Sequence, residues 1–396
     1  MTQMALDRPR TEADVIEIVS AAKRARTPLA IEGGGTRAGL GRPLHAPRKI
    51  STTDLTGITL YEPGEMVMSA RAGTPVSQIE AALAEKGQML PFEPMDHRAI
   101  YGSAGDPSIG GIAACNISGP RRIQSGAARD HILGLRVING RGEAVKSGGR
   151  VMKNVTGLDL VKLLCGSHGT LGVITEVTFK VLPRARRCAT LVVENLSDER
   201  ASACMSAALA TPYEVSGAAH VPAQGTESAR TYLRIEHFPE SVDYRLRELE
   251  KALAIFGKMT RLDHESSLTT WRDIRDVGPV ALPHEHALWR ISTAPTRGPM
   301  VMKAVSTSLK GRWFYDWGGG LIWFATAAQG DCGASIIRAA LGRAGHALLV
   351  RAPDELRSQT DVFEPLAEPL MKISRGVKTS FDPHHLFNPG RMYAGL

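Results

Sequence analysis

The sequence predicts an α+β protein that is divided into two parts. The chain has 396 residues, whereas a single hydrophobic core rarely extends beyond about 250 to 300 residues. In the first part, up to Pro183, short strands and helices alternate with glycine-rich turns. From Leu288 onward the apolar runs follow the order β-α-β-β-α-β, which is typical of an antiparallel sheet with helices on one side.

The elements of the first part have clear boundary signals. Thr11 followed by Asp14 opens a helix that runs to about Arg26, and Pro28 ends it. The further predicted elements are a strand at 29–31, a strand at 66–72, a helix over 76–83 that begins at Thr74 and Pro75 and closes at Gly87, a strand at 132–138, a turn at 139–142, a helix over 158–164 and a strand at 173–181.

The second part begins after 182–187, a predicted domain boundary. A helix after Ser241 carries apolar residues at three- and four-residue spacing and closes at Gly257. The unit that begins at Leu288 comprises a strand at 288–293, a helix over 300–309, strands at 312–317 and 321–327, a helix over 334–344 and a strand at 346–350. A fainter copy of this order runs from about 190 to 260, and a tail helix carries Leu366, Leu370, Ile373 and Val377.

The composition excludes several classes of protein. The chain has 48 Lys and Arg against 40 Asp and Glu, a net charge of +8 that favours an anionic partner. Its basic residues are dispersed and only 5% of residues are aromatic, which disfavours a nucleic-acid platform. Five scattered cysteines without a CxxC pair do not predict disulfides, zinc or an iron–sulfur cluster. Acidic residues in the first thirty positions and the lack of a long apolar run favour a cytoplasmic protein.

A glycine-rich turn follows the first predicted strand. Residues 33–38 fit the GxGxxA pattern of dinucleotide-binding folds, and Asp54 lies near the spacing of a ribose-binding acid. That fold requires a helix directly after the turn, whereas Gly39, Gly41, Pro43 and Pro47 follow here. Two alternatives remain, namely a surface loop without a ligand and a nest of backbone N–H groups that holds a pyrophosphate. The nest predicts further glycine-rich contacts elsewhere in the chain.

Two further glycine-rich clusters are present. The first, 102–121, contains so many small residues that we expect neither an ordinary helix nor an ordinary strand in it, and we expect its backbone to approach another group closely. The second comprises 157–160 and 166–174. The three clusters, in this order, together with Asn388-Pro389-Gly390-Arg391, resemble the FAD-binding domain of the vanillyl-alcohol oxidase family, also called the PCMH type.

Within that family the chain resembles the FAD-binding subunits of bacterial glycolate oxidase complexes. The similarity is carried by residues 28–36, 91–96, 288–292 and 316–320. The resemblance implies a two-part PCMH-type FAD-binding domain at 1–183 and a ferredoxin-like α/β-plait cap domain at 188–360. It also implies a C-terminal segment, 361–396, that returns to the flavin.

The resemblance also implies the contacts of the cofactor. The residues expected to bind FAD are Gly33, Gly34, Gly35, Thr36 and Arg37 at the pyrophosphate, Gly105, Gly110, Gly111, Asn116, Ser118 and Gly119 along the ribityl and isoalloxazine path, Gly172, Val173 and Ile174 on the adenine side, and Asn388 and Arg391 at the closing contact. Covalent members of the family attach the flavin through a His in the first loop or a Cys in the second. Here the first loop lacks His and Cys115 is an isolated candidate, so we expect non-covalent FAD.

The chemistry that the resemblance implies needs a cation for a substrate carboxylate and a base for a hydroxyl proton. Arg290, on a predicted cap strand, is the candidate cation, and Tyr315, Trp317 and Trp323 are candidates to shape a pocket or the core. The base stays open among His97, Tyr315 and His384. The paired-His metal motif of related 2-hydroxy-acid dehydrogenases is missing, and His284-Glu285-His286 is interpreted as a solvent-facing turn, so no metal is expected.

The function implied is oxidation of glycolate or D-lactate to the 2-oxo acid, with electrons passed through the flavin to partner subunits. The expected partners are a paralogous FAD subunit and an iron–sulfur subunit, with peripheral association with the inner membrane through the complex. Arg121, Arg122, Arg184, Arg186 and Arg187 are candidates to contact a partner or an anionic membrane face. The alternative function is a non-catalytic flavin-binding or scaffolding subunit that supports a catalytic paralogue.

Overall fold

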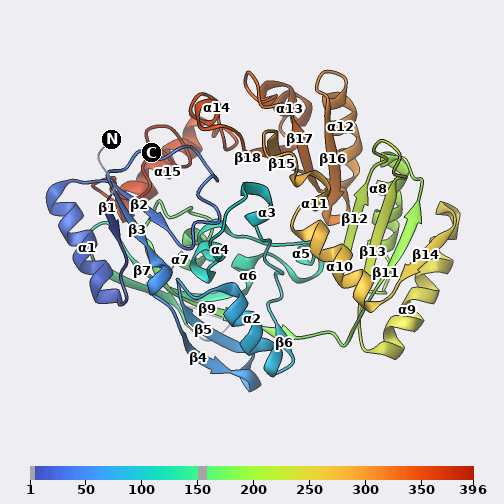
Figure 1. The fold of residues 1–396 in the computed structure, drawn as a ribbon, viewed down its shortest axis with the longest axis horizontal. Coiled ribbons are helices and arrows are strands. Elements are labelled where there is room, and N and C mark those ends of the chain that lie inside the picture. The colour runs from blue at the N-terminus through green and yellow to red at the C-terminus, as the bar shows by residue number, and fades with distance from the viewer. Residues whose placement is uncertain (1–4, 150–157) are drawn as a thin grey trace.

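The computed structural model describes residues 5–149 and 158–396. In it the chain is built around two large β-sheets (Figure 1). A five-stranded sheet lies at one end of the molecule, and an eight-stranded sheet lies at the other. The short helices α3 (Arg98–Tyr101), α4 (Ile109–Cys115) and α5 (Arg122–Ser125) lie between them (Figure 1). The predicted α+β class is confirmed. Gly157, which the sequence placed in the third glycine cluster, lies outside the described residues.

The chain begins with a small three-stranded parallel sheet in the order β1–β3–β2. Its elements are β1 (Ala5–Asp7), α1 (Glu12–Ala25), β2 (Leu29–Glu32) and β3 (Arg48–Ser51). The predicted start of α1 is confirmed, because the Thr11 hydroxyl accepts from the Asp14 N–H and the Asp14 carboxylate accepts from the Thr11 N–H. Leu386 and Phe387, near the C-terminus, pack into the same core. The two ends of the chain therefore share one hydrophobic cluster.

The five-stranded sheet is antiparallel and has the order β4–β5–β9–β7–β8. Its strands are β4 (Ile58–Glu62), β5 (Val67–Arg71), β7 (Ile132–Ile138), β8 (Ala144–Gly148) and β9 (Val173–Lys180). The helices α2 (Val76–Glu85), α6 (Ala128–His131) and α7 (Leu160–Leu164) contribute apolar side chains to its core, and a short pair of strands, β6 (Gln88–Met89) and β10 (Leu182–Pro183), lies beside it. The predicted strands at 66–72, 132–138 and 173–181 are confirmed.

Two local predictions in this region are wrong. The small-residue run 102–121 contains a seven-residue helix, α4, which the Ser108 hydroxyl caps. Small residues suit α4 because a Cβ on Gly110 would lie 2.6 Å from the Cβ of Ala72, so only glycine lets the helix pack on that residue. Thr74 does not cap α2. Its hydroxyl instead donates to the Arg71 carbonyl and accepts from the Gly57 N–H.

The eight-stranded sheet confirms the predicted β-α-β-β-α-β unit and its fainter copy. The strand order is β14–β11–β13–β12–β16–β17–β15–β18, with all neighbours antiparallel, and the two units meet between β12 and β16. The first unit comprises β11 (Arg187–Glu194), α8 (Asp198–Leu209), β12 (Val215–Val221), β13 (Arg230–His237), α9 (Pro239–Ala252) and β14 (Met259–Leu262). The second comprises β15 (Ala287–Thr293), α12 (Gly298–Ser306), β16 (Gly311–Asp316), β17 (Leu321–Thr326), α13 (Ala334–Leu341) and β18 (Gly345–Arg351).

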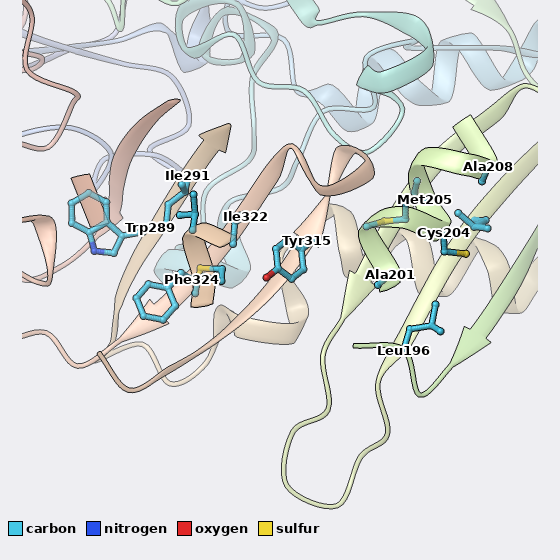
Figure 2. Close-up of a cluster of buried hydrophobic side chains, with 14 of the residues drawn as sticks. Leu196, Ala201, Cys204, Met205, Ala208, Trp289, Ile291, Tyr315, Ile322 and Phe324 are labelled. Atoms are coloured by element: carbon cyan, nitrogen blue, oxygen red, sulfur yellow. The ribbon is translucent and has the colours of Figure 1, made fainter. Parts of the chain in front are cut away.

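The two faces of this sheet have different partners. Helices α8, α9, α12 and α13 cover one face, where side chains such as Trp289, Phe324 and Met205 form the largest core cluster (Figure 2). Against the other face lie α10 (His264–Arg275) and α11 (Gly278–Ala281), and with them Leu40, Met95 and Ile100 from the first part of the chain. This second cluster joins the two parts of the molecule through apolar contacts.

A buried ionic network also joins the two parts. The Arg234 guanidinium, 2% exposed on β13, donates to both carboxylate oxygens of Glu93 at 2.8 and 3.0 Å. Glu236 pairs with Arg234 at 3.1 Å and with Arg121 at 3.0 Å. Burial alone would raise the pKa of the Glu93 carboxyl, but the charges of Arg234 and Arg121 hold it at about 2. Each of these buried charges therefore has an opposite charge within contact distance.

The C-terminal segment comprises α14 (Asp354–Gln359) and α15 (Glu368–Phe381) and returns to the first sheet (Figure 1). The tail helix is confirmed, but its apolar residues Leu370 and Ile373 are 54% and 63% exposed. A buried ion pair holds the segment instead: the Lys378 ammonium donates to Asp382 at 2.7 Å and to the Thr170 carbonyl at 2.7 Å. No helix of the described residues is long and apolar enough to cross a membrane.

We predict that Arg234→Ala lowers the free energy of unfolding by about 3 to 5 kcal/mol, since it leaves Glu93 and Glu236 buried without their main counter-charge. Urea denaturation followed by circular dichroism measures this change. The control, Arg375→Ala, removes an exposed ion pair with Glu368 and should cost less than about 1 kcal/mol. If both substitutions lower the free energy of unfolding by the same small amount, the buried network stabilises the protein no more than an exposed ion pair does.

Candidate functional site

A cavity of about 280 Å³ lies where the three glycine clusters and the C-terminal segment meet. Its volume is near the lower end of the range for ligand pockets. Of the predicted cofactor contacts, it is lined by Gly33, Gly34, Gly35, Thr36, Arg37, Gly110, Gly111, Gly172, Ile174, Asn388 and Arg391. The fold thus brings together residues that are more than 350 positions apart in the sequence.

The first two glycine clusters pack backbone against backbone. A Cβ on Gly34 would lie 1.9 Å from the Asp106 carbonyl oxygen, and a Cβ on Gly105 would lie 1.7 Å from the Gly34 carbonyl oxygen. A Cβ on Gly33 would lie 2.2 Å from the Ser108 hydroxyl oxygen. Real side chains do not tolerate such distances, so these positions need glycine to bring the two loops together. We expected the backbone of residues 102–121 to approach another group closely. At Gly105 that group is the backbone of the first glycine loop.

Asn388 joins the third glycine cluster to strand β2. Its side-chain Oδ1 accepts from the Ile31 N–H at 2.8 Å, and its Nδ2 donates to the His168 carbonyl at 2.9 Å. A Cβ on Gly169 would lie 2.8 Å from that Nδ2 atom. The predicted closing residue thus fixes the C-terminal segment beside the first loop, with its side chain bonded to protein groups.

Buried cations give the cavity its charge. Arg37 is 8% exposed, and its Nε and Nη2 atoms have no hydrogen-bond partner within the described ranges. Burial lowers the pKa of Arg37. Arg391 donates to the carbonyls of Arg37 and Ala38, and Arg357 donates to the carbonyl of Gly39 at 2.6 Å. A buried guanidinium with free donors beside a glycine loop fits an anionic group such as a pyrophosphate.

Other predicted cofactor contacts lie away from this cavity. Asn116 accepts from the Arg129 N–H at 3.0 Å and Ser118 accepts from the Ala128 N–H at 2.9 Å, so both side chains cap the turn into α6. A Cβ on Gly119 would lie 2.2 Å from the Glu93 carbonyl oxygen, and Val173 lies in a core cluster. Their roles toward the cofactor stay predictions.

The structure adds lining residues that the sequence did not single out. They include Lys49, Ala72, Ser108, His168 and Arg357, together with Cys115, which was singled out only for covalent attachment. Ser108 could not be found as a helix cap, because no helix was expected in the run 102–121. Arg357 lies in a short helix without a motif, and only the folded chain brings it to the first loop. Burial raises the pKa of the Cys115 thiol, which keeps it protonated.

The candidate catalytic residues lie in three different environments. Arg290 is half-buried on β15, and its guanidinium lies 5.1 Å from the centre of the Trp317 ring. The Tyr315 hydroxyl donates to Asp198 at 2.6 Å, and the side chain lies in the core on the helix-covered face (Figure 2). His384 is exposed after α15. None of the candidate catalytic residues, Arg290, Tyr315, His384 and His97, lines the cavity. Of the other two candidates to shape a pocket or the core, Trp323 lies in the core that joins the two parts, and Trp317 packs against that core.

His97, the third candidate base, is 3% exposed, and its Nδ1 atom has no partner among the described residues. A hydrogen bond with the Met95 backbone acts to raise the pKa of the imidazole. Burial, followed by the charges of Arg37 and Arg290, lowers the pKa of His97 to about 3. The imidazole is therefore neutral, and the positive charges of Arg37 and Arg290, two candidate anion-binding arginines, act on it.

The histidines of the predicted turn do not assemble a metal site. The His284 ring contacts the Ala99 carbonyl at 2.9 Å. Across residues 5–149 and 158–396, no group of three or more His, Cys, Asp or Glu side chains is arranged to hold a metal ion.

The low pKa of His97 predicts a pH dependence of stability. The native imidazole stays neutral, whereas the unfolded one, with a pKa of 6.5, binds a proton as the pH falls, so the native state loses stability between pH 6.5 and about 3. We expect the free energy of unfolding of the wild type to fall more steeply than that of His97→Asn, by about 1 kcal/mol per pH unit. Urea denaturation between these pH values measures both slopes, with His384→Asn as the control. Parallel slopes for wild type and His97→Asn would contradict the prediction.

Comparisons with known proteins agree with this geometry. A family model described as an FAD binding domain matches residues 4–148. The chain is 37% identical over 382 residues to glycolate oxidase subunit GlcE of Escherichia coli, covering 96% of this chain and 97% of that protein. It is 29% identical over 199 residues to D-lactate dehydrogenase of Archaeoglobus fulgidus, covering 50% of this chain and 43% of the dehydrogenase.

A solved structure of 4-ethylphenol oxidase from Gulosibacter chungangensis superimposes with a TM-score of 0.74, covering 98% of this chain and 89% of that one. Its sequence identity of 13% shows a shared fold alone. Together with the free donors of Arg37, the FAD binding domain match identifies the cofactor as FAD. By its relationship to GlcE over nearly its whole length, the chain belongs to the glycolate oxidase subunit family of FAD-linked oxidoreductases.

Proposed function

We propose that the protein oxidises a small 2-hydroxy acid, glycolate or D-lactate, to the 2-oxo acid. The relatives named above as a glycolate oxidase subunit and a D-lactate dehydrogenase support this substrate class. The observation that carries the proposal is Arg290: its guanidinium is half-buried between the two parts of the molecule and has no hydrogen bond or carboxylate partner in the described chain. A cation in that position is a receptor for a carboxylate.

In the proposed mechanism, Arg290 binds the substrate carboxylate and thereby orients the neighbouring hydroxyl group. The free Nδ1 of His97 accepts the hydroxyl proton. The cations that depress the pKa of His97 include Arg290, so an anionic substrate on Arg290 raises the basicity of the imidazole. Bound FAD would supply the acceptor for the hydride of the C–H bond, that is, for the hydrogen together with the two electrons. The roles predicted for Tyr315 and His384 stay predictions, and the bond from Tyr315 to Asp198 favours His97 as the base.

The same proposal assigns the cofactor contacts. The pyrophosphate binds at Gly33–Thr36 with Arg37 as counter-charge, Gly105–Gly111 follow the path toward the ring system, and Gly172–Ile174 lie on the adenine side. The cavity lined by the first loop and by Gly110 and Gly111 supports this path. We propose non-covalent attachment, a division into domains 1–183 and 188–360, and a flavin-facing segment at 361–396.

We further propose that the protein works within a complex. GlcE is named as a subunit, and the five cysteines here are free and scattered, so an iron–sulfur centre would belong to another chain. A paralogous FAD subunit and peripheral membrane association complete this proposal. Arg121 no longer belongs to the candidate partner surface because it is buried against Glu236, whereas Arg186 lies over the exposed ring of Phe238.

The glycine packing predicts a defect in cofactor binding. Gly34→Ala puts a methyl group against the Asp106 carbonyl and forces the first two loops apart. We expect FAD affinity to fall about ten-fold or more, which corresponds to about 1.4 kcal/mol of strain. Flavin absorbance of the purified protein and titration with FAD measure the loss. The control is Gly64→Ala, because no atom lies within 4 Å of the added methyl group. Equal FAD retention by both variants would refute the placement of the pyrophosphate at the first glycine loop.

The function is tested by mixing the FAD-loaded chain with glycolate or D-lactate without oxygen. We expect the visible flavin absorbance to bleach, and Arg290→Met to require about ten- to hundred-fold more substrate, the range for a lost charge-assisted hydrogen bond. Arg312→Met, on strand β16 of the same sheet, is the control. An oxidised spectrum that persists with both acids, in protein that retains FAD, would contradict the proposal and favour the non-catalytic scaffolding function.

A further inference from the structure

The interface between the two parts of the molecule holds a second cation beside Arg290. Trp317 follows β16, and its indole N–H donates to the Gly119 carbonyl at 3.1 Å, which ties the eight-stranded sheet to the loop before α5. The backbone of Trp317 is left-handed, with φ of 52°, a conformation that a bulky residue adopts only when its surroundings impose it. Trp317 is therefore a fixed platform at the interface.

Two guanidinium groups lie against this platform. Arg122, from α5, is 4.4 Å from the ring centre, and Arg290, from β15, is 5.1 Å from it. Both distances are measured to the same ring centre, so the two guanidinium carbons cannot be farther apart than the two distances combined. That separation is no more than about the Debye length of ~10 Å in 0.1 M salt. Two like charges at this separation, both half-buried, repel each other.

The surroundings do not neutralise this pair. Neither the Arg122 nor the Arg290 guanidinium has a hydrogen bond or an ion pair within the described parts of the chain, whereas the guanidinium of the adjacent Arg121 is paired with Glu236. Asp130, the carboxylate whose charge acts on Arg122, accepts from the Ala127 N–H at 2.8 Å. Glu364, whose charge acts on His346, accepts from the Ala347 N–H at 3.0 Å. Burial keeps the pKa of His346 below its ordinary value, which favours the neutral imidazole, so His346 adds no charge to the pair.

We propose that Arg122 is the second cation of the carboxylate site that contains Arg290, so that the two parts of the molecule each contribute one arginine to substrate recognition. This inference rests on the proposed function and extends it by one residue. A carboxylate bound at this interface relieves the repulsion between the two guanidinium groups. The site is complete only when α5 and β15 are packed together around Trp317.

The test measures binding of a carboxylate that cannot be oxidised. Propionate has the carboxylate of lactate without its hydroxyl, and propionamide is its neutral analogue. Isothermal titration of the FAD-loaded protein with each compound gives the affinities for wild type, Arg122→Gln and Arg122→Lys. We expect Arg122→Gln to weaken propionate binding about ten-fold or more, Arg122→Lys to recover part of the loss, and propionamide binding to stay unchanged.

Arg129→Gln is the matched control, since Arg129 is an exposed neighbour on α6 whose positive charge also reaches Arg122. It should bind propionate as the wild type does. Unchanged propionate binding by a folded Arg122→Gln variant would overturn the inference. An equal loss of propionate and propionamide would also overturn it, because that result assigns Arg122 to packing of Trp317.

The outcomes separate this inference from the proposed function. If glycolate or D-lactate bleaches the flavin and Arg122→Gln binds propionate normally, the oxidation stands and the role of Arg122 is refuted. If neither acid bleaches the flavin but propionate binding depends on Arg122, the anion site stands and the oxidation is refuted.

Discussion

The structure depends on the buried ion pair between Glu93 and Arg234. It connects a loop of the first part to a central strand of the eight-stranded sheet, and the Arg121 N–H donates to the same carboxylate at 3.0 Å. The segment from Gly119 to Arg121 is therefore held from both ends, since the Gly119 N–H donates to the Phe92 carbonyl at 2.9 Å. Arg122 is the next residue and opens α5. A stability element of the interface thus fixes the position of a candidate recognition residue.

The glycine clusters illustrate how one residue type serves two purposes. Gly34 and Gly105 are needed because two loops touch through their backbones, while Gly35, with open space around a Cβ and φ of 75°, is needed for its left-handed conformation. Asn388 then closes the arrangement by bonding both Ile31 and the His168 carbonyl. The cavity is consequently a product of long-range packing, although each of its parts is a short local motif.

The sequence predicted what depends on local patterns. The β-α-β-β-α-β order, the start of α1 and the lining of the cavity by Gly33–Arg37 follow from apolar periodicity, capping residues and glycine spacing. It failed where tertiary contacts decide: α4 forms in a run of small residues because the helix packs on Ala72. It did not foresee that Asn116 and Ser118 cap backbone N–H groups of the turn into α6, or that Arg357 reaches the first loop from more than 300 positions away.

The net charge of +8 is best understood through the arginines that are removed from solvent. Most of them satisfy protein groups: Arg234 and Arg121 bind carboxylates, and Arg351 donates to the carbonyls of Ile100 and Ala281. Arg37, Arg122 and Arg290 differ, because donors of each lack a carboxylate partner in the described chain. Leaving a cation partly desolvated and uncompensated costs free energy, so such positions persist where a ligand supplies the missing charge. Arg37 lies at the glycine loops, where a pyrophosphate carries that charge, and Arg122 and Arg290 lie at the interface, where a substrate carboxylate does.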